Sequence, residues 1–169
     1  MIKLTTDIIK SYAPCYCPTK YIPKDWSGSL VDILKMEEVS KLDRLWVARH
    51  AMDDKGNRLF AVWCAREALK LIPNPDPRSV EACNVAERFA NGEATKGELK
   101  VAKDAAYVAA AYAAGATAAY AADAADATAS YAAKADADAA AFADADADAR
   151  NKARQEQITR LIVYLTEES

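Results

Sequence analysis

Apolar residues along this chain recur at intervals of three and four, the spacing that gives an α-helix one apolar face. A run over residues 58–72 is apolar around most of the helix circumference, which is typical of a central helix. Two further runs consist of Leu42, Leu45 and Trp46, and of Ala82, Val85, Ala86 and Phe89. The alternating pattern of a half-buried strand is not seen, so the chain is predicted to be all-α.

Start and stop signals separate these helices. Ser29 with Asp32, and Thr95 with Glu98, have the spacing of capping boxes, and Ser40 is another candidate N-cap. Residues 53–57 are expected to form a turn, and residues 73–75, Pro-Asn-Pro, end the central helix.

The next helix is expected to begin with Asp76 as its cap and Pro77 as its first residue, and to end at Asn91-Gly92. Near the N-terminus, residues 5–12 fit a short helix. The prolines that follow it predict an irregular segment: Pro14, Pro18 and Pro23.

An eleven-residue repeat dominates the second half, where Tyr120, Tyr131 and Phe142 are spaced eleven apart and 28 of the 48 residues from 102 to 149 are alanine. Eleven residues is about three helical turns, so the three rings share one side of a helix. One straight helix from residue 96 to 166 would be about 105 Å long. We therefore expect breaks, at Gly115 or within residues 134–138, and two or three long helices packed antiparallel.

The final helix is predicted to be ordinarily amphipathic, with an apolar stripe that closes the core: Ile158, Leu161, Ile162 and Leu165. The predicted fold is an antiparallel helical bundle in a single domain of 169 residues. Within it, residues 1–28 are an irregular segment, 29–94 form short core helices, and 95–169 form the long alanine-rich helices.

Charge is distributed unevenly, although the net charge is only -3. Residues 102–149 carry 2 basic and 8 acidic side chains, a local charge of -6. Nucleic acid is disfavoured as the ligand because phosphate binding needs a basic surface, and a cationic partner is favoured.

A cytoplasmic location is expected because charged residues interrupt the apolar residues of the N-terminus, unlike a secretory signal. The uncharged run over residues 105–122 consists mainly of alanine, which is too weakly apolar for a membrane span. The four cysteines are expected to be reduced thiols.

The first candidate binding residues are Trp46, Arg49 and His50. If the apolar seam of their helix is Leu42, Leu45 and Trp46, then Arg49 and His50 continue it and point toward the bundle or its rim. The alternative is a C-terminal cap, because a cation in the last turn interacts favourably with the helix dipole. Asp53 and Asp54 would complete a polar cluster, but no nucleophile or phosphate-binding loop accompanies it, so catalysis is not predicted.

Trp63 and Arg66 are the other candidates, because exposed Trp and Arg are the residue types that contribute most to interfaces. Trp63 could equally be covered by the alanine-rich helices, which need large side chains to pack against.

No metal or cofactor is predicted. Cys15 and Cys17 lack the spacing of a zinc site, and Cys64 and Cys83 fit apolar helix faces. Aspartates spaced two apart lie about 200° apart on a helix, so Asp136, Asp138, Asp144, Asp146 and Asp148 form a solvated acidic surface instead of one ligand set.

Four runs give the chain a family resemblance: RLWVARHA at 44–51, FAVWCAREAL at 60–69, DPRSVEACNVAERFANGE at 76–93 and RQEQITRLIVYL at 154–165, with the alanine-rich block before the last. Over residues 42–165 the chain resembles the alanine-rich immunity-protein family of bacteria and phage. The resemblance implies a small helical protein, without catalysis, that neutralises a toxin or a host defence protein by binding and occluding it.

Two alternatives stay open. A phage-type sponge would hold a small signalling nucleotide through Arg49, His50, Arg66 or Trp63. Thr117 and Thr128, eleven apart, resemble the threonine ladder of helical ice-binding proteins, but Ala106 and Ala139 stand where further rungs would be. Self-association through the alanine faces is compatible with each role.

Overall fold

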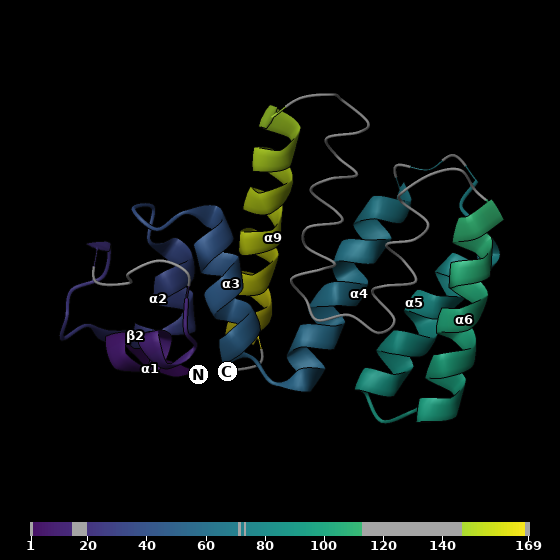
Figure 1. The fold of residues 1–169 in the computed structure, drawn as a ribbon, viewed down its shortest axis with the longest axis horizontal. Helices are drawn as coiled ribbons and strands as arrows, with labels where there is room; N and C mark the ends of the chain where they lie inside the picture. The colour runs from purple at the N-terminus through teal and green to yellow at the C-terminus, as the bar shows by residue number, and fades with distance from the viewer. Residues whose placement is uncertain (1, 15–19, 71, 73, 113–146, 168–169) are drawn as a thin grey trace. The chain divides into compact units, whose positions relative to one another are not determined.

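The computed structural model describes residues 2–14, 20–70, 72, 74–112 and 147–167 (Figure 1). The chain divides into two compact units. Unit 1 comprises Met1–Met52 with Ile158–Ser169, and unit 2 comprises Asp53–Gln157. The expectation of one domain stays a prediction.

Unit 1 begins with a small sheet that the sequence did not predict. Strand β1, Lys3–Thr5, pairs antiparallel with β2, Ser27–Ser29, with Leu4 opposite Gly28. The expectation that the chain contains no strand is therefore wrong here, whereas most of the described chain is helical, as predicted. Strands of three residues are too short to display an alternating pattern, and Ser-Gly-Ser has no apolar side chain. The described residues 2–14 and 20–28 are accordingly more regular than expected.

Unit 1 also contains three short helices, of which α2 and α3 begin where the capping signals predicted. Helix α1, Thr6–Ser11, is capped by Thr5, and α2, Leu30–Lys35, has the complete Ser29–Asp32 capping box. Helix α3, Lys41–Ala51, begins after Ser40, whose side chain accepts a hydrogen bond from the Asp43 backbone N–H. These caps satisfy backbone donors that a helix leaves unpaired at its start.

The core of unit 1 combines residues from both ends of the chain. Helix α9, Ala147–Glu167, contributes Ile158 and Leu161, which are fully buried. The predicted final stripe is thus confirmed in these two positions, while Ile162 and Leu165 are half-buried. The N-terminal part contributes a larger set of fully buried side chains: Leu4, Ile9, Ile22, Leu30, Ile33, Leu34, Val39 and Val47.

Unit 2 contains helices α4, Asp54–Lys70, α5, Pro77–Ala90, and α6, Lys96–Tyr112. Helix α5 packs against both α4 and α6. Helix α4 starts earlier than expected, because the Asp53 carboxylate accepts a hydrogen bond of 2.7 Å from the Gly56 backbone N–H. The turn predicted at residues 53–57 is therefore wrong, since Asp53 caps the helix and the next four residues belong to it.

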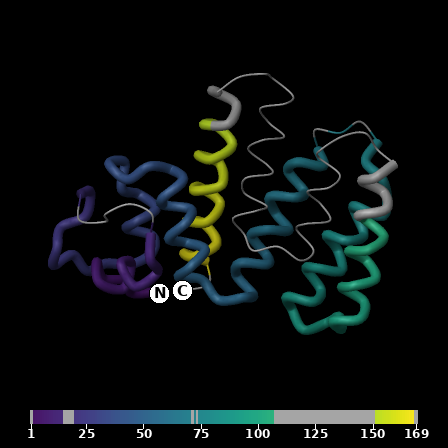
Figure 2. Tube along the Cα trace, in the orientation of Figure 1, coloured from purple at the N-terminus to yellow at the C-terminus, as the bar shows by residue number. Residues whose placement is uncertain are grey.

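The chain reverses between α5 and α6, as the tube in Figure 2 shows. Asp76 and Pro77 open α5 as predicted, and Gly92 after its end has a φ of 77°, a conformation that glycine adopts without strain. The Thr95 backbone N–H donates to Glu98 Oε2 over 2.8 Å, and the Glu98 N–H donates to Thr95 Oγ1 over 3.2 Å. This second capping box was also predicted, and it fixes the start of α6 close to the end of α5.

Several predictions concern residues outside the described ranges. These are the helix breaks at Gly115 and residues 134–138, the aromatic repeat of Tyr120, Tyr131 and Phe142, the threonine pair Thr117 and Thr128, most of the aspartate series, and Cys15 with Cys17. Among the helices that the structure describes, none has the length and apolar character needed to cross a membrane.

Candidate functional site

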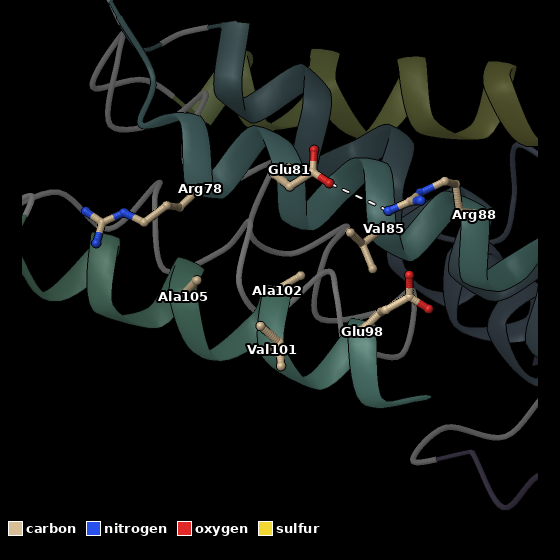
Figure 3. Close-up of a pocket in the computed structure, with 8 residues that line it drawn as sticks. All are labelled: Arg78, Glu81, Val85, Arg88, Glu98, Val101, Ala102 and Ala105. Atoms are coloured by element: carbon tan, nitrogen blue, oxygen red, sulfur yellow. Dashed lines mark ion pairs between the residues drawn. The ribbon is translucent and has the colours of Figure 1, made fainter. Parts of the chain in front are cut away.

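A groove of about 400 Å³ lies between α5 and α6 (Figure 3). Each helix contributes one stripe of side chains at helical spacing. The stripes are Arg78, Glu81, Val85 and Arg88 from α5, and Glu98, Val101, Ala102 and Ala105 from α6.

The floor of the groove is apolar. Val85 and Ala102 are buried there, whereas Val101 is 71% exposed. Ala102 and Ala105 have only a methyl group each, so the surface of α6 is recessed beside the larger Val101 side chain. A recess of this kind admits an apolar side chain from outside, and covering it would remove apolar surface from water.

The rim is charged but carries no net charge, with two arginines and two glutamates. Figure 3 shows Arg78 at one end, Arg88 and Glu98 at the other, and Ala102 between them. Arg88 and Glu81 lie 3.7 Å apart, a loose pair of exposed side chains along α5.

Arg78 and Glu98 each have a structural partner. Arg78 donates to the Asp76 carboxylate from Nε over 3.0 Å and from its terminal nitrogen over 2.8 Å. Hydrogen bonds from the Arg78 side chain and backbone lower the pKa of Asp76 to about 2. Hydrogen bonds from Thr95 lower the pKa of Glu98, and the nearby Arg88 contributes to the same shift.

The five predicted binding residues do not line this groove. Trp46, Arg49 and His50 belong to unit 1, and Trp63 and Arg66 belong to α4 in unit 2. The sequence signal for the groove is Val101 itself, a valine between Lys100 and Lys103 on the polar side of its helix, which is neither an aromatic nor a basic residue.

The apolar seam predicted for α3 is wrong. Leu42 is 55% exposed, and the buried residues are Arg44, Leu45, Val47 and Ala48. The apolar pattern gave the wrong buried face because Arg44, as a charged residue, was expected to lie at the surface. Its guanidinium instead donates a 2.9 Å hydrogen bond to the Leu34 carbonyl near the end of α2, which allows the side chain to be buried.

His50 consequently lies at the surface, in a cluster of three rings. Its ring is 4.1 Å from that of Trp46 and 5.4 Å from that of Tyr12 between centroids, and it is stacked on Tyr12. His50 Nδ1 lies 2.8 Å from the Trp46 carbonyl oxygen. Because a carbonyl only accepts, Nδ1 carries a proton and Nε2 is the basic nitrogen of the neutral ring. Burial raises the pKa of the Tyr12 hydroxyl.

Trp63 and Arg66 are both half-buried on α4. The Trp63 ring is nearly parallel to that of Phe60, one helical turn earlier, with centroids 6.1 Å apart. Arg66 donates two hydrogen bonds to the Glu87 carboxylate on α5, so its charge is paired with a residue of unit 2.

The described residues contain no group of three or more His, Cys, Asp or Glu side chains able to hold a metal ion. Cys64 and Cys83 are buried free thiols, as their positions on apolar helix faces predicted. Burial raises the pKa of the Cys83 thiol to about 11, against an opposing effect of Arg66.

Comparison of the chain with protein-family models, with curated proteins and with solved structures finds no match.

Proposed function

We propose that this chain is a helical binding protein of the immunity or inhibitor type, which neutralises a protein partner by occluding it. The groove between α5 and α6 supports this proposal most directly, because it combines an apolar floor with an exposed Val101 and a charged rim. Such a surface is typical of a protein interface, where an apolar centre is surrounded by polar groups.

The partner would present an amphipathic helix or loop whose apolar side chains fill the recess over Ala102 and Ala105. Its polar flanks would meet the rim charges, which orient the complex and select against partners of the wrong charge pattern. We further propose that the helices form an antiparallel bundle. The acidic alanine-rich segment attracts a cationic partner as the two proteins approach each other. The proposed setting is the cytoplasm, where a toxin or a host defence protein would be met.

The alternative, a small signalling nucleotide, has one observation in its favour. The exposed His50 with Tyr12 and Trp46 forms an aromatic surface next to Arg49, and aromatic rings with cations can hold a base and a phosphate. The rings already stack on one another, however, and so leave less ring surface for a base. We therefore place nucleotide binding second to protein binding.

The test is affinity capture from host lysate with three forms of the full chain: the wild type, Val101→Lys and Val80→Lys. Val80 is an exposed valine on α5 that does not line the groove, so Val80→Lys is a matched control. Lysine has good helix propensity, and both sites are exposed, so both variants should fold. Mass spectrometry would identify captured proteins and co-eluting small molecules.

We expect one protein to be enriched by the wild type and by Val80→Lys, and to be lost with Val101→Lys. Equal capture of that protein by all three forms would contradict the role of the groove. Recovery of a nucleotide alone would favour the alternative instead, and Trp46→Ala, captured as a fourth form, should then lose it.

A further inference from the structure

We propose that Asn91 is a site of spontaneous deamidation in the folded protein, where the Gly92 backbone nitrogen attacks the asparagine amide and a carboxylate results. The site is the turn between α5 and α6. The chain has five asparagines, and Asn91 alone is followed by glycine. The modification can be measured on the purified chain, whereas its effect on the groove rests on the proposed function.

The turn itself requires a glycine after Asn91, which is the C-cap of α5. The Glu93 N–H donates to the Arg88 carbonyl over 2.7 Å, and the Gly92 N–H donates to the Phe89 carbonyl over 3.1 Å. This pair of hydrogen bonds is a Schellman motif, in which the residue after the cap is left-handed, and Gly92 has a φ of 77°. Glycine adopts this conformation without strain, so the fold keeps a glycine next to Asn91.

Both reacting groups are open to solvent. Asn91 is exposed, and nothing in the part of the chain that the structure describes forms a hydrogen bond with its side-chain amide. A Cβ atom placed on Gly92 would meet no atom within 4 Å. The Asn91 side chain can therefore turn toward the Gly92 nitrogen, and water can reach both groups.

The reaction needs only water. Hydroxide removes the proton of the Gly92 amide, and the nitrogen then forms a bond to Asn91 Cγ. The bond between Cγ and the side-chain nitrogen breaks, and ammonia leaves after taking a proton from water, which restores the hydroxide. Water then adds to one carbonyl of the resulting succinimide and opens the ring to aspartate or isoaspartate. In sum, one amide and one water become one carboxylic acid and one ammonia.

One contact slows the reaction in the folded protein. The Gly92 N–H donates to the Phe89 carbonyl, so this hydrogen bond must open before the ring can close. The end of a helix opens at a lower free-energy cost than its centre, because fewer contacts hold it. Asn151 is also exposed, but it lies within α9 and is followed by Lys152, whose side chain hinders the attack. Deamidation is therefore expected at Asn91 before Asn151.

The new carboxylate would alter the groove at the end where Arg88 and Glu98 lie (Figure 3). Position 91 is three residues after Arg88, whose pair with Glu81 is loose at 3.7 Å, so the carboxylate competes with Glu81 for Arg88. The rim, neutral before, gains one negative charge. Isoaspartate also adds a methylene to the main chain of the turn. A partner matched to the neutral rim should therefore bind the deamidated chain less tightly.

The experiment is incubation of the full chain in native buffer at neutral and at mildly alkaline pH, followed by peptide mapping with mass spectrometry. Asn91 should lose its amide first, and faster at the higher pH, because the attacking nitrogen must be deprotonated. Asn151 is the internal control and should keep its amide over the same period. The same incubation in urea, which opens the turn, should be faster at Asn91. Circular dichroism checks that the chain in native buffer stays folded.

Asn91→Gln is the matched variant, because attack on the longer side chain would have to close a six-membered ring, which forms far more slowly. The position is exposed, so the variant should fold. On ion-exchange chromatography the incubated wild type should develop an acidic species that Asn91→Gln lacks. Hydroxylamine, which cleaves a chain at a succinimide, should cut the wild type into residues 1–91 and 92–169 and leave Asn91→Gln intact.

An Asn91 amide that survives in native buffer but is lost in urea would overturn the inference. Equal conversion of Asn91 and Asn151 would also overturn it, as would an acidic species that persists in Asn91→Gln.

The effect on the groove is tested by the capture experiment with Asn91→Asp, which should retain less of the captured protein than Asn91→Gln does. Equal capture by these two variants would overturn that effect. If the wild type itself captures no protein, the proposed function fails, whereas deamidation of the purified chain is still scored by mass spectrometry.

Discussion

Arg66 and Glu87 join α4 to α5 through a bidentate ion pair, with nitrogen–oxygen distances of 2.7 and 3.2 Å. The same guanidinium donates to Asn84 Oδ1 over 3.2 Å. The pair raises the pKa of Arg66 and lowers that of Glu87, in each case chiefly through the hydrogen bonds between them. Each group thus stabilises the charged form of the other.

Glu87→Gln should lower the free energy of unfolding by about 1 kcal/mol, at the upper end for a solvent-accessible pair, because the geometry is bidentate. Arg66→Lys should recover only part of the interaction, since a lysine cannot reproduce the two parallel hydrogen bonds. Urea denaturation followed by circular dichroism measures both effects.

The control for this pair is Glu67→Gln, which removes the pairing of Glu67 with Lys70 one turn away on the same helix. That variant should change the unfolding free energy by less than about 0.5 kcal/mol. An equal loss in Glu87→Gln and Glu67→Gln would show that the connection between α4 and α5 contributes nothing beyond a helix surface pair.

Arg44 predicts a contrast between two substitutions. It is 6% exposed, and burial lowers its pKa because the charged guanidinium is removed from water. Arg44→Ala should cost about 3 kcal/mol, since it leaves a cavity and an unpaired Leu34 carbonyl. Arg44→Met also leaves the Leu34 carbonyl unpaired, but it keeps the aliphatic volume and removes the buried charge, so it should cost only about 1–2 kcal/mol. Thermal and urea unfolding distinguish the two, and a larger loss in Arg44→Met than in Arg44→Ala would contradict this account.

The sequence predicted those parts of the fold that depend on local chemistry. Ser29, Ser40, Asp76 and Thr95 each cap a helix, because the side-chain oxygen satisfies a backbone donor within three residues. Such interactions need no knowledge of the distant chain.

Features that depend on distant contacts were missed. Strand β2 is formed by Ser-Gly-Ser, and only its pairing with Lys3–Thr5 makes it a strand. The burial of Arg44 depends on the Leu34 carbonyl, ten residues away. The groove was not predicted for the same reason, because the recess beside Val101 exists only where α5 and α6 lie against each other.

Acid should destabilise the start of α5 through Asp76. Its folded pKa of about 2 lies below the ordinary value of 3.8, so the stabilisation is complete above that value and is lost as the pH falls toward 2. Asp76→Asn keeps an N-cap acceptor but does not titrate, so the unfolding free energy of this variant should fall less between about pH 5 and pH 2. Urea denaturation at several pH values tests this, and parallel pH curves for the two proteins would rule out Asp76 as a contributor.

Cys64 and Cys83 should react with a thiol reagent only when unit 2 opens. Both are fully buried, and a pKa of about 11 instead of 9.0 reduces the population of the Cys83 thiolate about 100-fold near neutral pH.

The double variant Cys15→Ser, Cys17→Ser leaves these two thiols as the only ones in the chain. In that variant, Ellman's reagent should label neither thiol rapidly under native conditions, and both should react at once in denaturant. Increasing urea below the unfolding midpoint should accelerate labelling in proportion to the opened fraction, because the thiolate is attacked only in that state. One equivalent of rapid labelling in native buffer would show that one thiol is accessible in the folded protein and that its burial does not control its reactivity.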